Sequence, residues 1–489
     1  MIHPAATLLL ALGLIATAPV RAAHPSLALS ACELEDPLGV LSVAAECGTL
    51  PVPENPADPR GRWIRVRLAR IPAINRRKRS DPLFVLAGGP GMAAMLFYPS
   101  VAPPFARIHR DRDIILLDQR GTGDSNPLDC ALEDDELNRG AVADVVAEAS
   151  ACLSGLKPKA DVRFYTTSVA VGDLDTVRTR LGYERINLYG VSYGTRVAQQ
   201  YARRFPQQVR TMILDGVVPP QLALGPQVAI NAQHALMRIL ARCAAEVRCH
   251  SRFEDPLATY RELRATLRTH SIPVTLADPT SGERTRIDFG EYQLATVLRL
   301  STYTAEQAAL LPLMLDRARH SGDLQPLAAQ FMLESRSVSH AIAYGMHNSV
   351  VCSEDVPFYP ASMARSQIED TYPGTLQVDA LRSICAIWPR GPVDSDLHAP
   401  LHTDVPVLLL SGSDDPITPP ADAERARGGF AHSVHVLLRG FGHGQLTAPC
   451  IDQVMARFLA AGKVEGLDVA CTKADVPMPF FTSLGAPAP

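Results

Sequence analysis

The sequence has little of what would place the protein in a membrane, on a polyanion or around a metal ion. Its amino-terminal apolar stretch, Ala5 to Ala18, has 14 residues, fewer than the roughly 20 that span a bilayer as a helix. The formal net charge is −4 over 489 residues, so no basic surplus points to a nucleic-acid partner. No Cys-x-x-Cys pair occurs, and the spacing of His432 and His435 has little value for a metal site. We therefore expect no metal, no cofactor, no nucleic-acid partner and no stable membrane insertion.

Cysteine is absent from the first 31 residues, and all ten cysteines follow the apolar stretch. An even number of cysteines is typical of disulfide-bonded proteins in an oxidising compartment, so we expect five disulfides. The order of pairing does not follow from the sequence. Pairs of sequential neighbours, such as Cys243 with Cys249, are the simplest hypothesis.

The amino terminus has the pattern of a signal peptide. The apolar stretch is followed by Pro19-Val20-Arg21-Ala22, whose small residues predict cleavage after Ala22 and export to the periplasm or the exterior. Leu29-Ser30-Ala31-Cys32 resembles a lipoprotein cleavage box, but it lies too far from the apolar core. Lipidation of Cys32 would also leave an odd number of cysteines.

The remaining chain divides into three parts by pattern. Residues 23–218 contain short apolar strands that alternate with helices, which predicts an α/β fold with a mainly parallel, doubly wound sheet. Residues 219–400 are dominated by amphipathic helical stretches, with one hairpin expected around residues 274–289. Residues 401–489 return to strands and helices. The middle part is therefore expected to be a largely helical cap inserted into the α/β core.

The pentapeptide Gly190-Val191-Ser192-Tyr193-Gly194 lies between a strand-like run and a helical run. A G-x-S-x-G sequence in this context predicts a sharp turn that raises the serine hydroxyl above the sheet edge. The first N–H groups of the following helix would point toward a developing oxyanion. A turn whose serine only caps a helix is the alternative.

An acid and a histidine follow the serine in the chain order of a catalytic triad. The apolar run Val405–Leu410 predicts a buried strand that ends near Asp414 and Asp415, where open α/β sheets place their sites. Another short strand precedes His443, which lies on a glycine-rich loop. A strand-end aspartate can instead cap a helix, and a loop histidine can be merely solvated. The match of all three elements in order favours a triad.

Together these motifs resemble the secreted α/β-hydrolase serine aminopeptidases, in particular the tripeptidyl aminopeptidase branch, which is related to the proline iminopeptidases. The resemblance runs from about residue 83 to 445. It rests on Gly88-Gly89-Pro90-Gly91, Asp118-Gln119-Arg120-Gly121-Thr122-Gly123, the Ser192 turn, Asp415-Pro416-Ile417-Thr418-Pro419 and Gly442-His443. Proline iminopeptidases carry a histidine where this chain has Ala87, which weakens any expectation of strict proline specificity.

The resemblance implies a role for each motif. Ser192 would be the nucleophile, His443 the general base and Asp415, rather than its neighbour Asp414, the acid that orients the imidazole. The N–H groups of Tyr193 and Gly89 would form the oxyanion hole.

The implied activity is that of a serine exopeptidase acting near a free amino terminus. Recognition of a free amine calls for a carboxylate under the cap, and the resemblance places an acid near a cap cysteine, which favours Glu354 and Asp355. A surface acidic pair that caps a loop is the alternative. A carboxylesterase with the same triad and a non-catalytic relative are the competing functions, and the presence of all three catalytic residue types disfavours the latter. The oligomeric state does not follow from the sequence.

Overall fold

The computed structural model describes residues 27–36, 39–130, 142–360, 365–474, 476–483 and 485. The predicted signal peptide, residues 1–22, lies outside the described residues, and its prediction is therefore untested.

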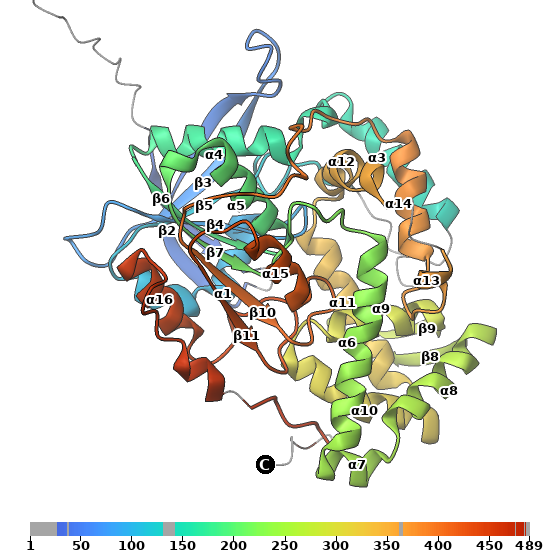
Figure 1. Ribbon diagram of the computed structural model, residues 1–489. Coiled ribbons are helices and arrows are strands. Elements are labelled where there is room, and N and C mark those ends of the chain that lie inside the picture. Colours follow the sequence, from blue (N-terminus) through green and yellow to red (C-terminus); the bar gives the residue numbers. More distant parts are fainter. Residues whose placement is uncertain are drawn as a thin grey trace, which may run out of the picture.

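A nine-stranded sheet forms the centre of the described chain (Figure 1). The first strands pair antiparallel as far as the contact of β3 with β5, and all strands from β5 onward run parallel. The prediction of an α/β fold with a mainly parallel sheet is thus confirmed. In spatial order the strands are β1 (Ser30–Glu35), β2 (Ser42–Pro53), β3 (Trp63–Ile71), β5 (Ile114–Leu117), β4 (Leu83–Leu86), β6 (Ile186–Val191), β7 (Val209–Asp215), β10 (Val407–Gly412) and β11 (Ser433–Leu438).

Helices cover both faces of this sheet, which is why its central strands are continuous apolar runs. Every residue of β4, β5 and β10 is buried, as expected for parallel strands packed on two sides. On one face the apolar core includes α4 (Thr167–Arg180), α5 (Tyr193–Arg204) and α15 (Pro420–Arg427). On the other face it includes α1 (Ala94–Val101), α2 (Ala106–His109) and α16 (Ile451–Ala461).

A largely helical segment separates β7 from β10 and has an apolar core of its own. Its hairpin lies where the sequence predicted one. Figure 1 shows this segment beside the sheet. Its elements are α6 (Pro226–Ala245), α7 (Val247–Phe253), α8 (Pro256–Thr269), β8 (Ile272–Ala277), β9 (Arg284–Phe289), α9 (Glu291–Ser301), α10 (Ala305–His320), α11 (Gln325–Ala341), α12 (Tyr344–Glu354), α13 (Ser366–Glu369) and α14 (Leu376–Ile387).

Helix α12 returns from this segment to the sheet and joins the core of the face that carries α5. Helix α3 (Val142–Leu156), which precedes α4, packs against α14 and α12. Short 3₁₀ turns complete the described elements at Pro103–Phe105, Val162–Phe164, Pro206–Gln208, Val356–Phe358 and Ala470–Ala474.

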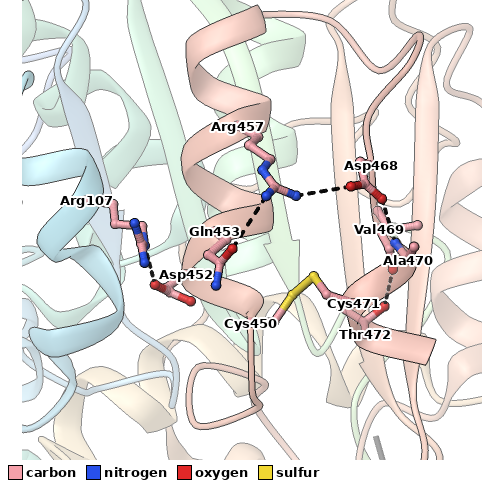
Figure 2. Close-up of a disulfide and its surroundings, with 10 residues drawn as sticks. All are labelled: Arg107, Cys450, Asp452, Gln453, Arg457, Asp468, Val469, Ala470, Cys471 and Thr472. Atoms are coloured by element: carbon pink, nitrogen blue, oxygen red, sulfur yellow. Dashed lines mark hydrogen bonds and ion pairs between the residues drawn. A yellow bond between two sulfur atoms is a disulfide. The ribbon is translucent and has the colours of Figure 1, made fainter. Parts of the chain in front are cut away.

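Five disulfides join sequential pairs of cysteines, which agrees with the predicted number and with the simplest pairing. Figure 2 shows the last of them, between Cys450 at the start of α16 and Cys471. The ion pair of Arg457 with Asp468 spans the same two segments, so a covalent and an ionic contact hold the carboxyl-terminal segment to the helix. The pairs are Cys32–Cys47, Cys130–Cys152, Cys243–Cys249, Cys352–Cys385 and Cys450–Cys471.

Within the described ranges, no helix combines the length and the apolar character that crossing a bilayer requires.

Candidate active site

Ser192 lies at the turn from β6 into α5, in a backbone conformation that residues other than glycine rarely adopt. Its φ is 55° and its ψ is −125°, so the turn is strained and depends on its surroundings. A Cβ added at Gly190 would lie 2.4 Å from the Gly194 carbonyl oxygen, and one at Gly194 would lie 2.3 Å from that of Leu86. Both glycines are therefore required by close backbone contacts. The Ser192 N–H donates to the Asp215 carbonyl oxygen at 2.9 Å, which ties the turn to the end of β7.

His443 and Asp415 lie together at the carboxyl ends of the neighbouring strands. Nδ1 of His443 is 2.9 Å from Oδ2 of Asp415, whose side chain is fully buried. The other carboxylate oxygen, Oδ1, accepts the N–H groups of Ile417 and Thr418 at 2.8 and 2.9 Å, and the Thr418 hydroxyl donates to Oδ2 at 2.9 Å. These donors hold the carboxylate in one orientation, and it in turn orients the imidazole.

Asp414, the alternative acid, is directed elsewhere. Its Oδ1 lies 3.5 Å from Nε of Arg238 and accepts the Ser413 hydroxyl at 3.2 Å. Of the two neighbouring aspartates, Asp415 is the one that contacts His443.

The helical segment between β7 and β10 contributes directly to the environment of His443. The carbonyl oxygen of Tyr303, which follows α9, accepts the backbone N–H of His443 at 2.8 Å. The rings of Tyr303 and His443 meet edge to face, with their centroids 5.1 Å apart. Burial lowers the pKa of His443, but the charge and hydrogen bond of Asp415 outweigh this effect, so the pKa is raised above its ordinary value. The site therefore favours the protonated imidazole more than water does.

Glycines allow two backbone segments to lie close to the side chains of Ser192 and His443. A Cβ added at Gly88 would lie 3.1 Å from Cβ and 3.7 Å from Oγ of Ser192, so the loop after β4 lies directly against the serine. A Cβ at Gly216 would lie 3.1 Å from Cε1 of His443. Gly89 has a φ of 106°, and its position in the loop beside Ser192 is the one that the sequence assigned to an oxyanion donor.

Glu354 and Asp355, the two candidates for amine binding, lie inside the protein. Both side chains are fully buried at the end of α12. The guanidinium of Arg196, on α5, contacts both Asp355 oxygens at 2.8 and 3.2 Å and lies 3.6 Å from Glu354. Glu354 also accepts the N–H and hydroxyl of Thr167 at 2.6 and 2.8 Å. These carboxylates already have partners inside the protein.

This buried cluster reaches the turn of the candidate site. The Thr167 hydroxyl lies 2.6 Å from the hydroxyl of Tyr193, the residue after Ser192. Burial raises the pKa of Glu354 to about 7, against the lowering effect of Arg196. Sequence reasoning missed Arg196, although an arginine one turn into a helix that must pack on a sheet is a signal for a buried ion pair.

Among the residues that the structure describes, no group of three or more histidine, cysteine or acidic side chains is arranged to hold a metal ion.

The elbow serine, the histidine paired with an aspartate and the mainly parallel sheet define the class of the protein. Residues 81–446 match the family model described as the alpha/beta hydrolase fold. The chain belongs to this family, and it is a serine hydrolase, as the sequence motifs predicted.

Individual relatives refine this class. The chain is 26% identical over 483 residues to "Serine protease Hip1" of Mycobacterium tuberculosis, covering 90% of each chain. It is 25% identical over 478 residues to "Tripeptidyl aminopeptidase" of Streptomyces lividans, covering 89% of this chain and 85% of the relative. It is 28% identical over 409 residues to "Carboxylesterase B" of Mycobacterium tuberculosis, covering 77% and 76%. The first two matches confirm the resemblance to the serine aminopeptidases.

Proposed function

We propose that the protein is an exported serine exopeptidase that hydrolyses peptide bonds near a free amino terminus and releases single residues or tripeptides. The observation that carries the proposal is the hydrogen bond between Asp415 and His443, whose imidazole lies against Gly216, next to the Asp215 carbonyl that binds the strained turn of Ser192. The names of two relatives, a serine protease and a tripeptidyl aminopeptidase, support peptide substrates. Five disulfides support an oxidising compartment.

The proposed mechanism assigns one step to each group. His443 takes the proton of the Ser192 hydroxyl as the oxygen attacks the scissile carbonyl, and Asp415 stabilises the imidazolium that forms. The N–H groups of Tyr193 and Gly89 donate to the oxyanion of the tetrahedral intermediate. His443 then gives its proton to the leaving amine, which leaves an acyl group on Ser192. Water, deprotonated by the same histidine, hydrolyses this acyl-enzyme and restores the free serine.

The resemblance implied that Glu354 and Asp355 recognise the substrate amine. We propose a structural role for them instead. Their burial and their contacts with Arg196 support a structural role in which they fasten α12 of the cap to the helix that follows the nucleophile. Amine binding by these two residues stays an untested prediction.

A carboxylesterase is the second candidate function. Its support is the relative named as a carboxylesterase, and the chemistry on Ser192 would be the same. Ester hydrolysis alone therefore does not separate the two functions.

The deciding experiment compares a tripeptidyl arylamide carrying a free amine with its acetylated counterpart, using the mature protein and the Ser192→Ala variant as the blank. The exopeptidase requires faster hydrolysis of the free amine, because recognition of the ammonium contributes binding energy in the productive pose. Equal rates on both arylamides, or cleavage of an aryl ester without any amide cleavage, would replace the exopeptidase by the esterase.

A further inference from the structure

Asp215, the last residue of β7, is a second carboxylate close to His443 that the proposed triad does not use. Its side chain is fully buried. One oxygen, Oδ2, accepts the hydroxyl of Tyr189 at 2.8 Å and the N–H of Gln445 at 2.9 Å. The other oxygen, Oδ1, is inaccessible and has no hydrogen-bond partner in the described part of the chain. Burying a carboxylate oxygen without a hydrogen-bond donor costs free energy. This cost suggests that the negative charge of Asp215 itself has a function.

Asp215 contacts both the turn that carries Ser192 and the loop that carries His443. Its carbonyl oxygen accepts the N–H of Ser192, and the adjoining Gly216 lies against the imidazole of His443. Gln445 is two residues beyond His443, so the Asp215 carboxylate also holds the loop that carries the histidine. The same residue thus contacts the backbone of the nucleophile and the loop of the base.

We propose that Asp215 is a positioning residue for His443. Its carboxylate fixes the histidine loop through the Gln445 N–H. Its negative charge, with that of Asp415, stabilises the imidazolium that forms when His443 takes the proton of Ser192. In a buried site such a charge is weakly screened, so it acts without touching the ring. The inference rests on the proposed roles of Ser192 and His443, and not on the identity of the substrate.

The charges around His443 come from several elements. Asp415 follows β10 and Asp215 ends β7, and both raise the pKa of His443, whereas burial and Arg299 of α9 lower it. Tyr303 packs against the ring from the cap. Burial raises the pKa of Asp215 itself to about 6, and the nearby Asp415 adds to this effect. Asp215 is therefore mostly ionised above about pH 6 and carries its negative charge when the imidazole of His443 is deprotonated at higher pH.

The test is Asp215→Asn, because an amide of the same shape can still accept both hydrogen bonds at the position of Oδ2 while the charge is lost. Hydrolysis of p-nitrophenyl butyrate is measured from pH 5 to 9. The rate of ester hydrolysis depends on the protonation state of His443 whether or not peptides are the natural substrates. We expect kcat to fall on the order of tenfold with little change in KM, because the charge acts on the transition state. The acid limb of kcat/KM should move to lower pH by at least about 0.5 unit, because a less stabilised imidazolium has a lower pKa.

Gln445→Ala is the matched control, because it loosens the same loop but keeps the charge of Asp215. It removes the side-chain hydrogen bond from Gln445 to the Gly442 carbonyl oxygen and leaves the Gln445 N–H in place. An acid limb that moves in Asp215→Asn and stays in Gln445→Ala supports the proposal. An acid limb unchanged in Asp215→Asn overturns it, whatever happens to kcat. If the asparagine variant does not fold, Asp215→Ser, which is neutral and smaller, takes its place with the same expected shift.

The experiment separates this inference from the proposed function. Wild-type ester hydrolysis that survives in Ser192→Ala would defeat the assignment of the nucleophile. Ester hydrolysis without peptide cleavage would defeat the exopeptidase and leave the role of Asp215 fully testable.

Discussion

Replacing Arg196 by methionine should destabilise the fold strongly, because this one guanidinium is paired with two fully buried carboxylates. The change removes two contacts with Asp355, at 2.8 and 3.2 Å, and the 3.6 Å contact with Glu354. It also removes the donor to the Leu222 carbonyl oxygen at 3.0 Å. Among the contacts of the described residues, Asp355 would keep the N–H of Leu224, and Glu354 would keep Thr167.

The magnitude follows from the cost of a buried charge without its partner. Breaking a buried ion pair costs about 3–5 kcal/mol, and an orphaned buried carbonyl adds about 1 kcal/mol. The free energy of unfolding should therefore fall by roughly 4–6 kcal/mol at pH 8. The loss should be smaller at pH 5. Burial raises the pKa of Glu354 to about 7 even with Arg196 present. Lowering the pH to 5 therefore protonates Glu354 and removes its repulsion with the carboxylate of Asp355.

The assay is urea unfolding of the disulfide-intact protein, followed by far-UV circular dichroism at pH 8 and pH 5. Arg204→Met, on the same helix, is the control, because that side chain is 37% exposed and lies 3.6 Å from Asp394. A partly exposed pair contributes about 1 kcal/mol or less. A loss in Arg196→Met no larger than in Arg204→Met, or an equal loss at both pH values, would refute the argument.

Three further outcomes follow from the same structure. Ser192→Ala should abolish hydrolysis and leave the unfolding curve close to wild type, and a serine-directed phosphonate should add its mass once to the wild type and not to this variant. Asp415→Asn should lower kcat by roughly 10³–10⁴-fold through the wrong imidazole tautomer, whereas Asp414→Asn should change it only a few-fold; the reverse ranking would reassign the acid. Because Asp415 raises the pKa of His443 and the neutral imidazole is the active base, kcat/KM should fall as the pH drops through a value above 6.5, and the acid limb of Asp415→Asn should lie at lower pH.

Local sequence patterns determined the class of the fold and the chain order of the candidate site. Apolar runs bounded by turn residues predicted the alternating strands of residues 23–218, and the run Val405–Leu410 predicted β10 within two residues of its observed bounds, because a strand buried on both faces must be apolar throughout. The glycines around Ser192 also predicted the turn. At Gly190 the reason is local, because a Cβ would lie 2.4 Å from the Gly194 carbonyl oxygen, whereas at Gly194 the close contact is with the Leu86 carbonyl oxygen of another strand.

Tertiary structure alone decided the environment of each charged group. The sequence offered Glu354 and Asp355 as acids for amine binding, but it gave no sign that they pair with Arg196, which lies more than 150 positions earlier in the chain. Asp215 reads in the sequence as an ordinary strand-end acid, and its link to Gln445 spans 230 positions. The propensity of a residue for a strand, turn or helix depends on its immediate neighbours in the sequence and can therefore be predicted from a short stretch of it. The energy of a charge depends on which groups surround it once water is excluded, and those groups are brought together only by the folded chain.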